Sequence, residues 1–199
     1  MTKLTTLRNV ASLPDAIPAL GDCALVLVDC QQTYREGLMQ LAGVEDALAE
    51  AAHVLQRARA LDCPVFHIQH DAGPGSPYDI RERIGAIAEP VAPRDEEPVI
   101  VKHLPNAFID TDLEARIAAT GRKDVVIVGF MTHMCINSTA RGAFNLGLNP
   151  IVVATATATR DLPGPDGQAV PAALLQQASL AALGDLFARV VPTSDALPG

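Results

Sequence analysis

The chain has 199 residues, a formal net charge of -8 at pH 7 and a pI near 5.0, an acidic balance that argues against general binding to nucleic acid or to an anionic membrane surface. No Ser/Gly tract or charge block divides the sequence, so we expect a single domain over residues 1–199 with a substantial core. The longest apolar run, residues 125–131, is far shorter than the ~20 residues that span a bilayer, and the first ten residues have no apolar signal core, which together favour a cytoplasmic protein.

Six apolar runs predict strands. They lack the polar alternation of half-exposed strands, and continuous Val/Ile/Leu runs are typical of a parallel sheet covered on both faces. The predicted strands are at about 23–29, 64–69, 98–101, 124–129, 150–154 and 187–191.

Helical segments separate these strands. In the first, apolar residues recur at helical spacing from Val44 until Pro64 stops the pattern. Thr111 and Glu114 fit a capping box at the start of the second. The predicted helices cover 44–61, about 112 to just before Gly121, 132–147 and roughly 168–183.

Two stretches interrupt the alternation, the Gly- and Pro-rich residues 71–94 and the residues 161–167, which read DLPGPDG. Loops this long usually carry function or become ordered on assembly. Strands alternating with helices through right-handed crossovers predict a single-domain, three-layer α/β/α fold with a doubly wound parallel sheet. Such folds bind ligands beyond the carboxyl ends of their strands.

Three reactive residue types lie at those predicted strand ends: Asp29 after the first strand, Lys102 after the third and Cys135 shortly after the fourth. A thiol at a helix start lies near unpaired backbone N–H groups and the positive end of the helix dipole, which predicts a lowered pKa for Cys135. A carboxylate accepts a thiol proton when a cation balances the charges, which makes Asp29 the candidate base and Lys102 the candidate counter-charge. Taken singly, each residue has an ordinary explanation as a cap, a solvated charge or a buried thiol. Their combination favours catalysis.

The four cysteines, at positions 23, 30, 63 and 135, show neither a CxxC pair nor metal-finger spacing. This spacing argues against a disulfide framework or structural zinc, and Cys23 and Cys63 are expected to remain free thiols even if they are neighbours. The first strand is followed by DCQQTY, without the glycines of a dinucleotide-binding or P-loop turn, and no GxSxG elbow surrounds Ser138.

Three segments closely resemble the isochorismatase-like cysteine hydrolases, a family that includes nicotinamidases and N-carbamoylsarcosine amidases. They read DCQQTY (29–34), VKHLPNAFIDTDL (101–113) and GFMTHMCINSTARGAFNLG (129–147), and the resemblance extends over nearly the whole chain. It implies that Asp29, Lys102 and Cys135 form the catalytic triad and that the strands lie in the order 3-2-1-4-5-6. It also implies a cis peptide between Phe130 and Met131, with the N–H groups of Met131 and Cys135 as an oxyanion hole.

The implied reaction is hydrolysis of a small molecule at a non-peptide C–N bond, in an amide, carbamoyl group or lactam, through a thioester on Cys135. The alternatives are a vinyl-ether hydrolase of the isochorismatase type, in which the family lacks the cysteine, and a non-catalytic oligomeric scaffold or thiol sensor. Pocket candidates from the same segments and the second strand are Gln31, Tyr34, His70, Asn106, Phe108, Phe130 and His133.

The chain departs from its relatives at several positions. Nicotinamidases hold a metal with a DxHxxxH motif after the second strand, whereas this chain reads HIQHDAGPGSPYD from His67 and lacks that aspartate. We therefore expect no metal and no cofactor. Thr155 replaces a common aspartate and Gln176 a frequent histidine, which limits transfer of any one substrate.

The family tends to assemble, and its Ala- and Gly-rich helices, here 140–147 and 169–183, suit close packing between subunits. We expect a homo-oligomer in which residues 71–94 build part of the active-site mouth, either of their own chain or of a neighbour.

Overall fold

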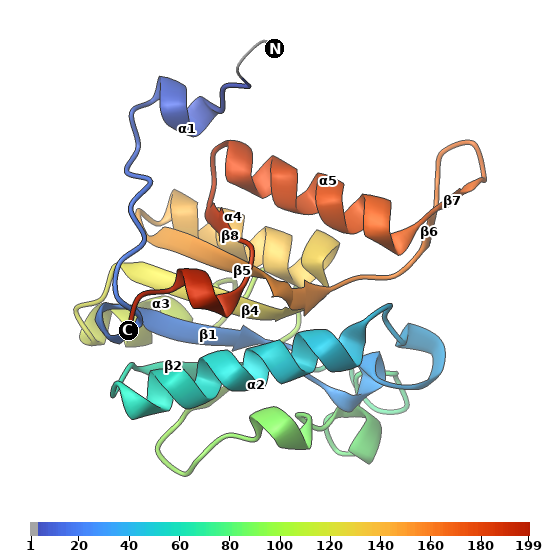
Figure 1. Ribbon diagram of the computed structural model, residues 1–199. Helices are drawn as coiled ribbons and strands as arrows, with labels where there is room; N and C mark the ends of the chain where they lie inside the picture. The colour runs from blue at the N-terminus through green and yellow to red at the C-terminus, as the bar shows by residue number, and fades with distance from the viewer. Residues whose placement is uncertain (1–3) are drawn as a thin grey trace.

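A six-stranded parallel sheet forms the centre of the molecule (Figure 1), in a computed structural model that describes residues 4–199. The spatial order is β3-β2-β1-β4-β5-β8, which confirms the expected order 3-2-1-4-5-6 because β8 is the sixth strand of this sheet. Every neighbouring pair is parallel. The strands are β1 (Ala24–Val28), β2 (Val65–His70), β3 (Val99–Lys102), β4 (Asp124–Phe130), β5 (Asn149–Ala158) and β8 (Arg189–Val191).

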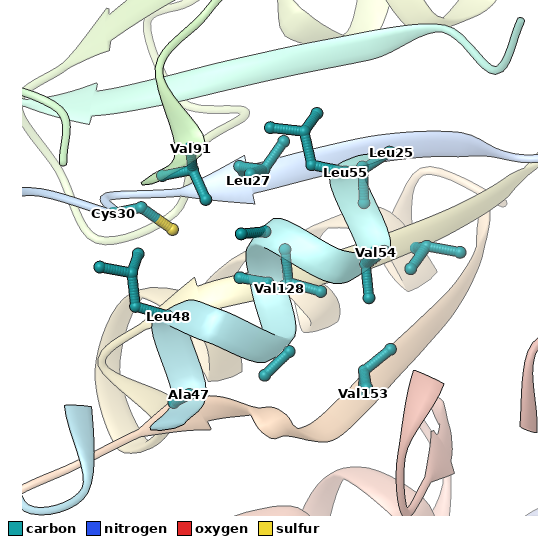
Figure 2. Close-up of a cluster of buried hydrophobic side chains, with 14 of the residues drawn as sticks. Leu25, Leu27, Cys30, Ala47, Leu48, Val54, Leu55, Val91, Val128 and Val153 are labelled. Carbon is teal, nitrogen blue, oxygen red and sulfur yellow. The ribbon is translucent and has the colours of Figure 1, made fainter. Parts of the chain in front are cut away.

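Helices cover both faces of the sheet, as the continuous apolar strands require. On one face lies α2 (Val44–Ala60), whose Leu48 and Leu55 pack with Leu27 and Val128 of the sheet; Figure 2 shows this cluster. On the other face lie α3 (Leu113–Ala119), α4 (Asn137–Asn145) and the C-terminal end of α5 (Ala172–Asp185). The two apolar clusters are the two cores of a three-layer domain.

The remaining elements are short. Residues 71–94 contain two 3-10 turns and pair through Ile87 with Gln31. Residues 161–167 lie in an antiparallel hairpin of β6 (Leu162–Pro163) with β7 (Ala169–Val170). The other short elements are α1 (Leu7–Val10), a π-helical turn η6 (Thr132–Ile136) and the 3-10 turns η1 (Leu20–Asp22), η2 (Gln32–Tyr34), η3 (Gly37–Met39), η4 (Arg83–Gly85), η5 (Glu89–Val91) and η7 (Ser194–Ala196).

Three helix predictions need correction. The capping box of Thr111 and Glu114 is wrong, because α3 starts after Asp112 without a side-chain cap and the Thr111 hydroxyl donates instead to Ala107 O at 2.6 Å. The helix expected over 132–147 begins as the π-helical turn η6 and ends at Asn145. The last helix starts at 172 rather than 168, because residues 169–170 pair as β7.

The carboxyl ends of β1 and β4 approach each other closely. Val28 is paired with Gly129, which has a φ of +116°, and a Cβ at position 129 would lie 2.0 Å from Val28 O. Only glycine fits this point. Asp29 follows one strand directly, and Phe130 ends the other, so the side chains that follow both strands meet at the same edge of the sheet.

Within residues 4–199 no helix has the length and apolar character needed to cross a bilayer.

Candidate active site

Asp29 leaves β1 in a left-handed conformation, with a φ of +51°. Its N–H donates to Ile68 O of β2 at 3.0 Å, and its carbonyl accepts from Gln31 N at 2.8 Å. These bonds fix the backbone on both sides of the residue. Its side chain is 0% exposed. The backbone therefore holds a carboxylate inside the protein at the end of the central strand.

Lys102 is the last residue of β3 and reaches across β2 to this carboxylate. Its Nζ lies 2.7 Å from Asp29 Oδ2, and neither side chain is exposed. The contact is an ion pair rather than an aligned hydrogen bond, and both Asp29 oxygens lack a hydrogen-bond partner among the described residues. The same ammonium donates to Cys135 Sγ at 3.4 Å and lies 3.4 Å from His70 Nδ1. One buried cation thus joins the acid, the thiol and a histidine.

Cys135 lies in the π-helical turn η6 and is only 5% exposed. Its pKa is raised to about 12, because burial and the charge of Asp29 outweigh the opposing effect of Lys102. The lowered pKa expected from a helix start is therefore wrong for the resting site. Burial raises the pKa of Asp29 as well, and Lys102 opposes that rise. The site holds a protonated thiol beside a carboxylate of increased basicity.

The turn between β4 and η6 carries the cis peptide expected at Phe130–Met131. Met131 O accepts from Met134 N at 3.0 Å and from Ile136 N at 3.2 Å, which fixes the turn that leads to the thiol. Met131 and Cys135 are both nearly buried.

A series of aromatic contacts reaches His70, the histidine beside the Lys102 ammonium. The buried Tyr34 contacts Phe130 and Tyr78 edge-on, with ring centroids 5.7 and 5.8 Å apart, and Tyr78 meets His70 at 5.1 Å. Burial, then the charge of Lys102, lowers the pKa of His70 to about 4, so this ring is neutral at neutral pH and can accept from the ammonium. Sequence reasoning missed Tyr78, although it lies in the stretch 71–94 that was expected to carry function.

His133 lies two residues before Cys135 in the same π-helical turn. Its Nδ1 lies 2.5 Å from Thr159 Oγ1, just beyond β5, and burial lowers its pKa. Thr159 is itself held by a bond from Ala42 N to its carbonyl at 2.9 Å. The residue after β5 thus contacts the turn that carries Cys135, and the sequence did not reveal this contact.

Three of the pocket candidates make contacts that hold the surrounding structure. Gln31 is fully buried, and its amide bonds the backbone of His70 and of Gly85, so it fastens residues 71–94 to the end of β1. Asn106 accepts from Phe108 N at 3.0 Å and lies so close to Gly142 that a Cβ there would be 2.6 Å from its amide. Phe108 packs against the core beneath α3 and α4.

The histidines of the second strand do not fit the metal site of nicotinamidases. His67 is buried, and its Nε2 lies 3.0 Å from Glu97, which also pairs with Arg59 at 2.7 Å. His70 lies against the ammonium of Lys102, where a metal cation would be repelled. Across residues 4–199 there is no group of three or more His, Cys, Asp or Glu side chains placed to hold a metal ion.

Thr155 and Gln176 lie at a second place, a cavity of about 870 Å³ between α2, β5 and α5 that no triad residue lines. Thr155 donates to Glu50 at 3.2 Å, and Gln176 Nε2 donates to Thr157 Oγ1 at 2.8 Å. Both residues therefore hold the carboxyl-terminal half of β5, apart from Asp29, Lys102 and Cys135.

Comparison with known proteins gives a consistent result. The family model for the isochorismatase domain matches residues 23–195. The chain is 31% identical over 193 residues to the secreted isochorismatase effector Isc1 of Verticillium dahliae, covering 96% of this chain and 99% of that protein. It is 34% identical over 178 residues to a streptothricin hydrolase of Streptomyces noursei, covering 88% of this chain and 64% of that protein.

Among solved structures, an isochorismatase from Pseudomonas putida KT2440 has a TM-score of 0.93 and 33% sequence identity, over 97% of this chain and 99% of that chain. The likeness therefore covers nearly the whole chain. Because the Verticillium relative is secreted, cytoplasmic residence of this chain stays a prediction.

Proposed function

Because the chain belongs to the isochorismatase family of hydrolases, we propose that Cys135 is the nucleophile with which it cleaves a C–N bond in a small amide, carbamoyl or lactam compound. The observation that carries this proposal is the position of the Lys102 ammonium, 2.7 Å from Asp29 Oδ2 and 3.4 Å from Cys135 Sγ. The ammonium thus contacts both a carboxylate that can act as a base and a thiol, and a buried cluster of this kind is typical of a site that activates a nucleophile.

In the first half of the reaction, Asp29 takes the proton of Cys135 Sγ, and Lys102 stabilises the thiolate. The sulfur adds to the substrate carbonyl carbon, and the backbone N–H groups of Met131 and Cys135 stabilise the oxyanion, each such donor being worth roughly 10²–10³ in rate. When the C–N bond breaks, the protonated Asp29 gives its proton to the departing amine. The products of this half are an amine and a thioester on Cys135.

In the second half, the regenerated Asp29 carboxylate removes a proton from water, and the hydroxide adds to the thioester carbon. Collapse of this intermediate releases the acid, and the thiolate regains its proton from Asp29. The sum is hydrolysis of one C–N bond by one water. The resting pKa values suit these steps, because a protonated thiol needs a base and burial increases the basicity of the carboxylate that contacts the ammonium.

Vinyl-ether hydrolysis is the second candidate, favoured by the names of the Verticillium and Pseudomonas relatives. That reaction proceeds without a thiol nucleophile. Whether turnover depends on Cys135 therefore separates the two reactions.

The deciding experiment is a hydrolysis screen of the whole chain, which measures ammonia release from small amides and ureas and the ring-opened amino acid from lactams, with isochorismate assayed in parallel. Cys135→Ala is the blank, and Cys63→Ala, which removes an equally buried thiol outside the site, is the matched control. We expect ammonia release that Cys63→Ala retains and Cys135→Ala loses, with an acyl adduct on Cys135 in the mass spectrum.

Cleavage of isochorismate that survives Cys135→Ala would instead favour the vinyl-ether reaction. Alkylation of Cys135 without turnover of any compound would favour the scaffold or thiol sensor.

A further inference from the structure

The Lys102 ammonium has three N–H groups and contacts three acceptors. Two of these contacts, to Asp29 Oδ2 at 2.7 Å and to Cys135 Sγ at 3.4 Å, are made with the groups that exchange a proton in the proposed reaction. The third contact, to His70 Nδ1 at 3.4 Å, is made with a ring that takes no part in that exchange. His70 is therefore the unchanging partner of a cation whose other two partners change charge.

The fold holds His70 in a defined place beside this ammonium. His70 and Lys102 are register partners on the parallel strands β2 and β3, so their side chains leave the same face of the sheet. The buried amide of Gln31 accepts from His70 N at 2.9 Å and donates to His70 O at 3.0 Å. Tyr78 packs edge-on against the imidazole, with the ring centroids 5.1 Å apart. The backbone and the ring of His70 are thus both restrained.

The charge state of the imidazole suits an acceptor. Burial, then the positive charge of Lys102, lowers the pKa of His70 to about 4. The charge of His103 adds to this shift, and that of Asp71 opposes it. A neutral imidazole carries one proton, and a bond from the ammonium to Nδ1 places that proton on Nε2. A protonated ring would instead repel the ammonium at this distance.

Resting on the proposed function, we infer that His70 is a positioning residue, whose unprotonated Nδ1 holds the Lys102 ammonium beside Cys135 Sγ while the thiol proton passes to Asp29. In that step the negative charge moves from the carboxylate to the sulfur, and the ammonium has to stabilise the new thiolate. A neutral acceptor binds the ammonium before and after the transfer alike. Without it, the resting ammonium would move towards Asp29, its nearest partner, and away from the sulfur.

Two substitutions separate the acceptor from the ring. His70→Asn keeps an acceptor, its Oδ1, close to the place of Nδ1 but removes the ring. His70→Phe keeps a ring against Tyr78 but removes the acceptor. Neither substitution changes the charge, because the imidazole is neutral at neutral pH. His53→Phe makes the same exchange at an exposed position of α2 and is the matched control.

The first measurement is the rate at which iodoacetamide alkylates Cys135 at about pH 9, followed on the peptide that contains this thiol, because the thiolate is the reacting form. Turnover is measured in parallel as ammonia release from butyramide and propylurea and as ring opening of 2-pyrrolidinone. Finally, NMR of the wild type with 15N-labelled histidine identifies the ring nitrogen of His70 that carries the proton. The signals of His70 are those that His70→Asn lacks.

His70→Phe should slow the alkylation and lower kcat by about 10-fold or more with little change in KM, since a hydrogen bond to a charged group is worth at least this factor and the bond matters most after proton transfer. His70→Asn should stay within about threefold of the wild type, because it restores a neutral acceptor. His53→Phe should match the wild type. The spectrum of the wild type at neutral pH should show a neutral His70 with its proton on Nε2.

Alkylation of His70→Phe at the wild-type rate or faster would overturn the inference, as would a loss in His70→Asn as large as that in His70→Phe. A proton on Nδ1 of His70 would overturn it too. If urea unfolding shows that His70→Phe does not fold, the site of the ring proton and the alkylation of His70→Asn decide. Failure of every variant and of the wild type to turn over any of the three compounds would count against the proposed function alone, because the alkylation and the NMR spectrum do not depend on turnover.

Discussion

Replacement of Lys102 by Met should reveal how strongly the site depends on its buried cation. The substitution leaves Asp29 enclosed at 0% exposure without its partner at 2.7 Å, and removal of one member of a buried pair typically costs about 3–5 kcal/mol. With a urea m-value of about 2 kcal/mol/M for a chain of this size, the unfolding midpoint should fall by roughly 1.5–2.5 M.

The loss should depend on pH in one direction. Burial raises the pKa of Asp29 and Lys102 holds it down, so removal of Lys102 raises this pKa further. A carboxyl whose pKa is higher in the folded than in the unfolded protein takes up a proton on folding. Its contribution to the free energy of unfolding therefore falls as pH rises from the unfolded pKa, about 3.9, through the folded pKa. The deficit of Lys102→Met should therefore be smallest near pH 4 to 5 and largest near pH 8.

Urea unfolding at several pH values checks both statements. The matched control is Arg116→Met, which breaks an ion pair of the same 2.7 Å length to Asp112 on the protein surface, where solvent screening should leave the midpoint near that of the wild type. The double variant Asp29→Asn with Lys102→Met should be more stable than Lys102→Met alone, since it removes the stranded charge. A deficit in Lys102→Met that is the same at every pH, and strictly additive with that of Asp29→Asn, would refute the reasoning.

Three further outcomes are expected. Because the pKa of Cys135 is about 12, iodoacetamide should alkylate it slowly at pH 7. Asp29→Asn should speed the alkylation, because it removes the negative charge that opposes the thiolate. Intact mass spectrometry measures both rates, and fast labelling of the wild type would contradict this account. Gly129→Ala should destabilise the chain by more than about 4 kcal/mol in thermal or urea unfolding, because its Cβ would lie 2.0 Å from Val28 O. The control Gly121→Ala, at a φ of +72° but in open space, should cost only about 1 kcal/mol. Light scattering should find a homo-oligomer, and a monomer across the accessible concentrations would remove that expectation.

The proximity of Asp29, Lys102 and Cys135 was predictable for one physical reason. Parallel strands end at the same edge, so Asp29, Lys102 and the residues after β4 had to meet once the apolar runs were identified as strands. The raised pKa of Cys135 was not predictable, because the direction of the pKa shift depends on how deeply the tertiary fold buries the sulfur.

The contacts of residues in loops were harder still to predict. The sequence placed Gln31 in a pocket, but its amide is used to fasten the backbone of residues 71–94, a contact no spacing rule contains. Tyr78 comes from an irregular segment whose course is set by packing, so its contacts with Tyr34 and His70 could be seen only in three dimensions.

Local opening of the two edge strands, β3 and β8, would affect Asp29, Lys102 and Cys135 differently. Lys102 ends the edge strand β3, whose Val99 and Val101 are partly open to solvent, and its ammonium crosses β2 to reach Asp29. A local opening that releases β3 would withdraw the cation from the carboxylate and the thiol together, at the energetic cost of a stranded charge. Opening of β8 at the opposite edge leaves all three residues in place. Native-state hydrogen exchange should therefore find that β3, although a four-residue edge strand, opens less readily than its length and exposure suggest.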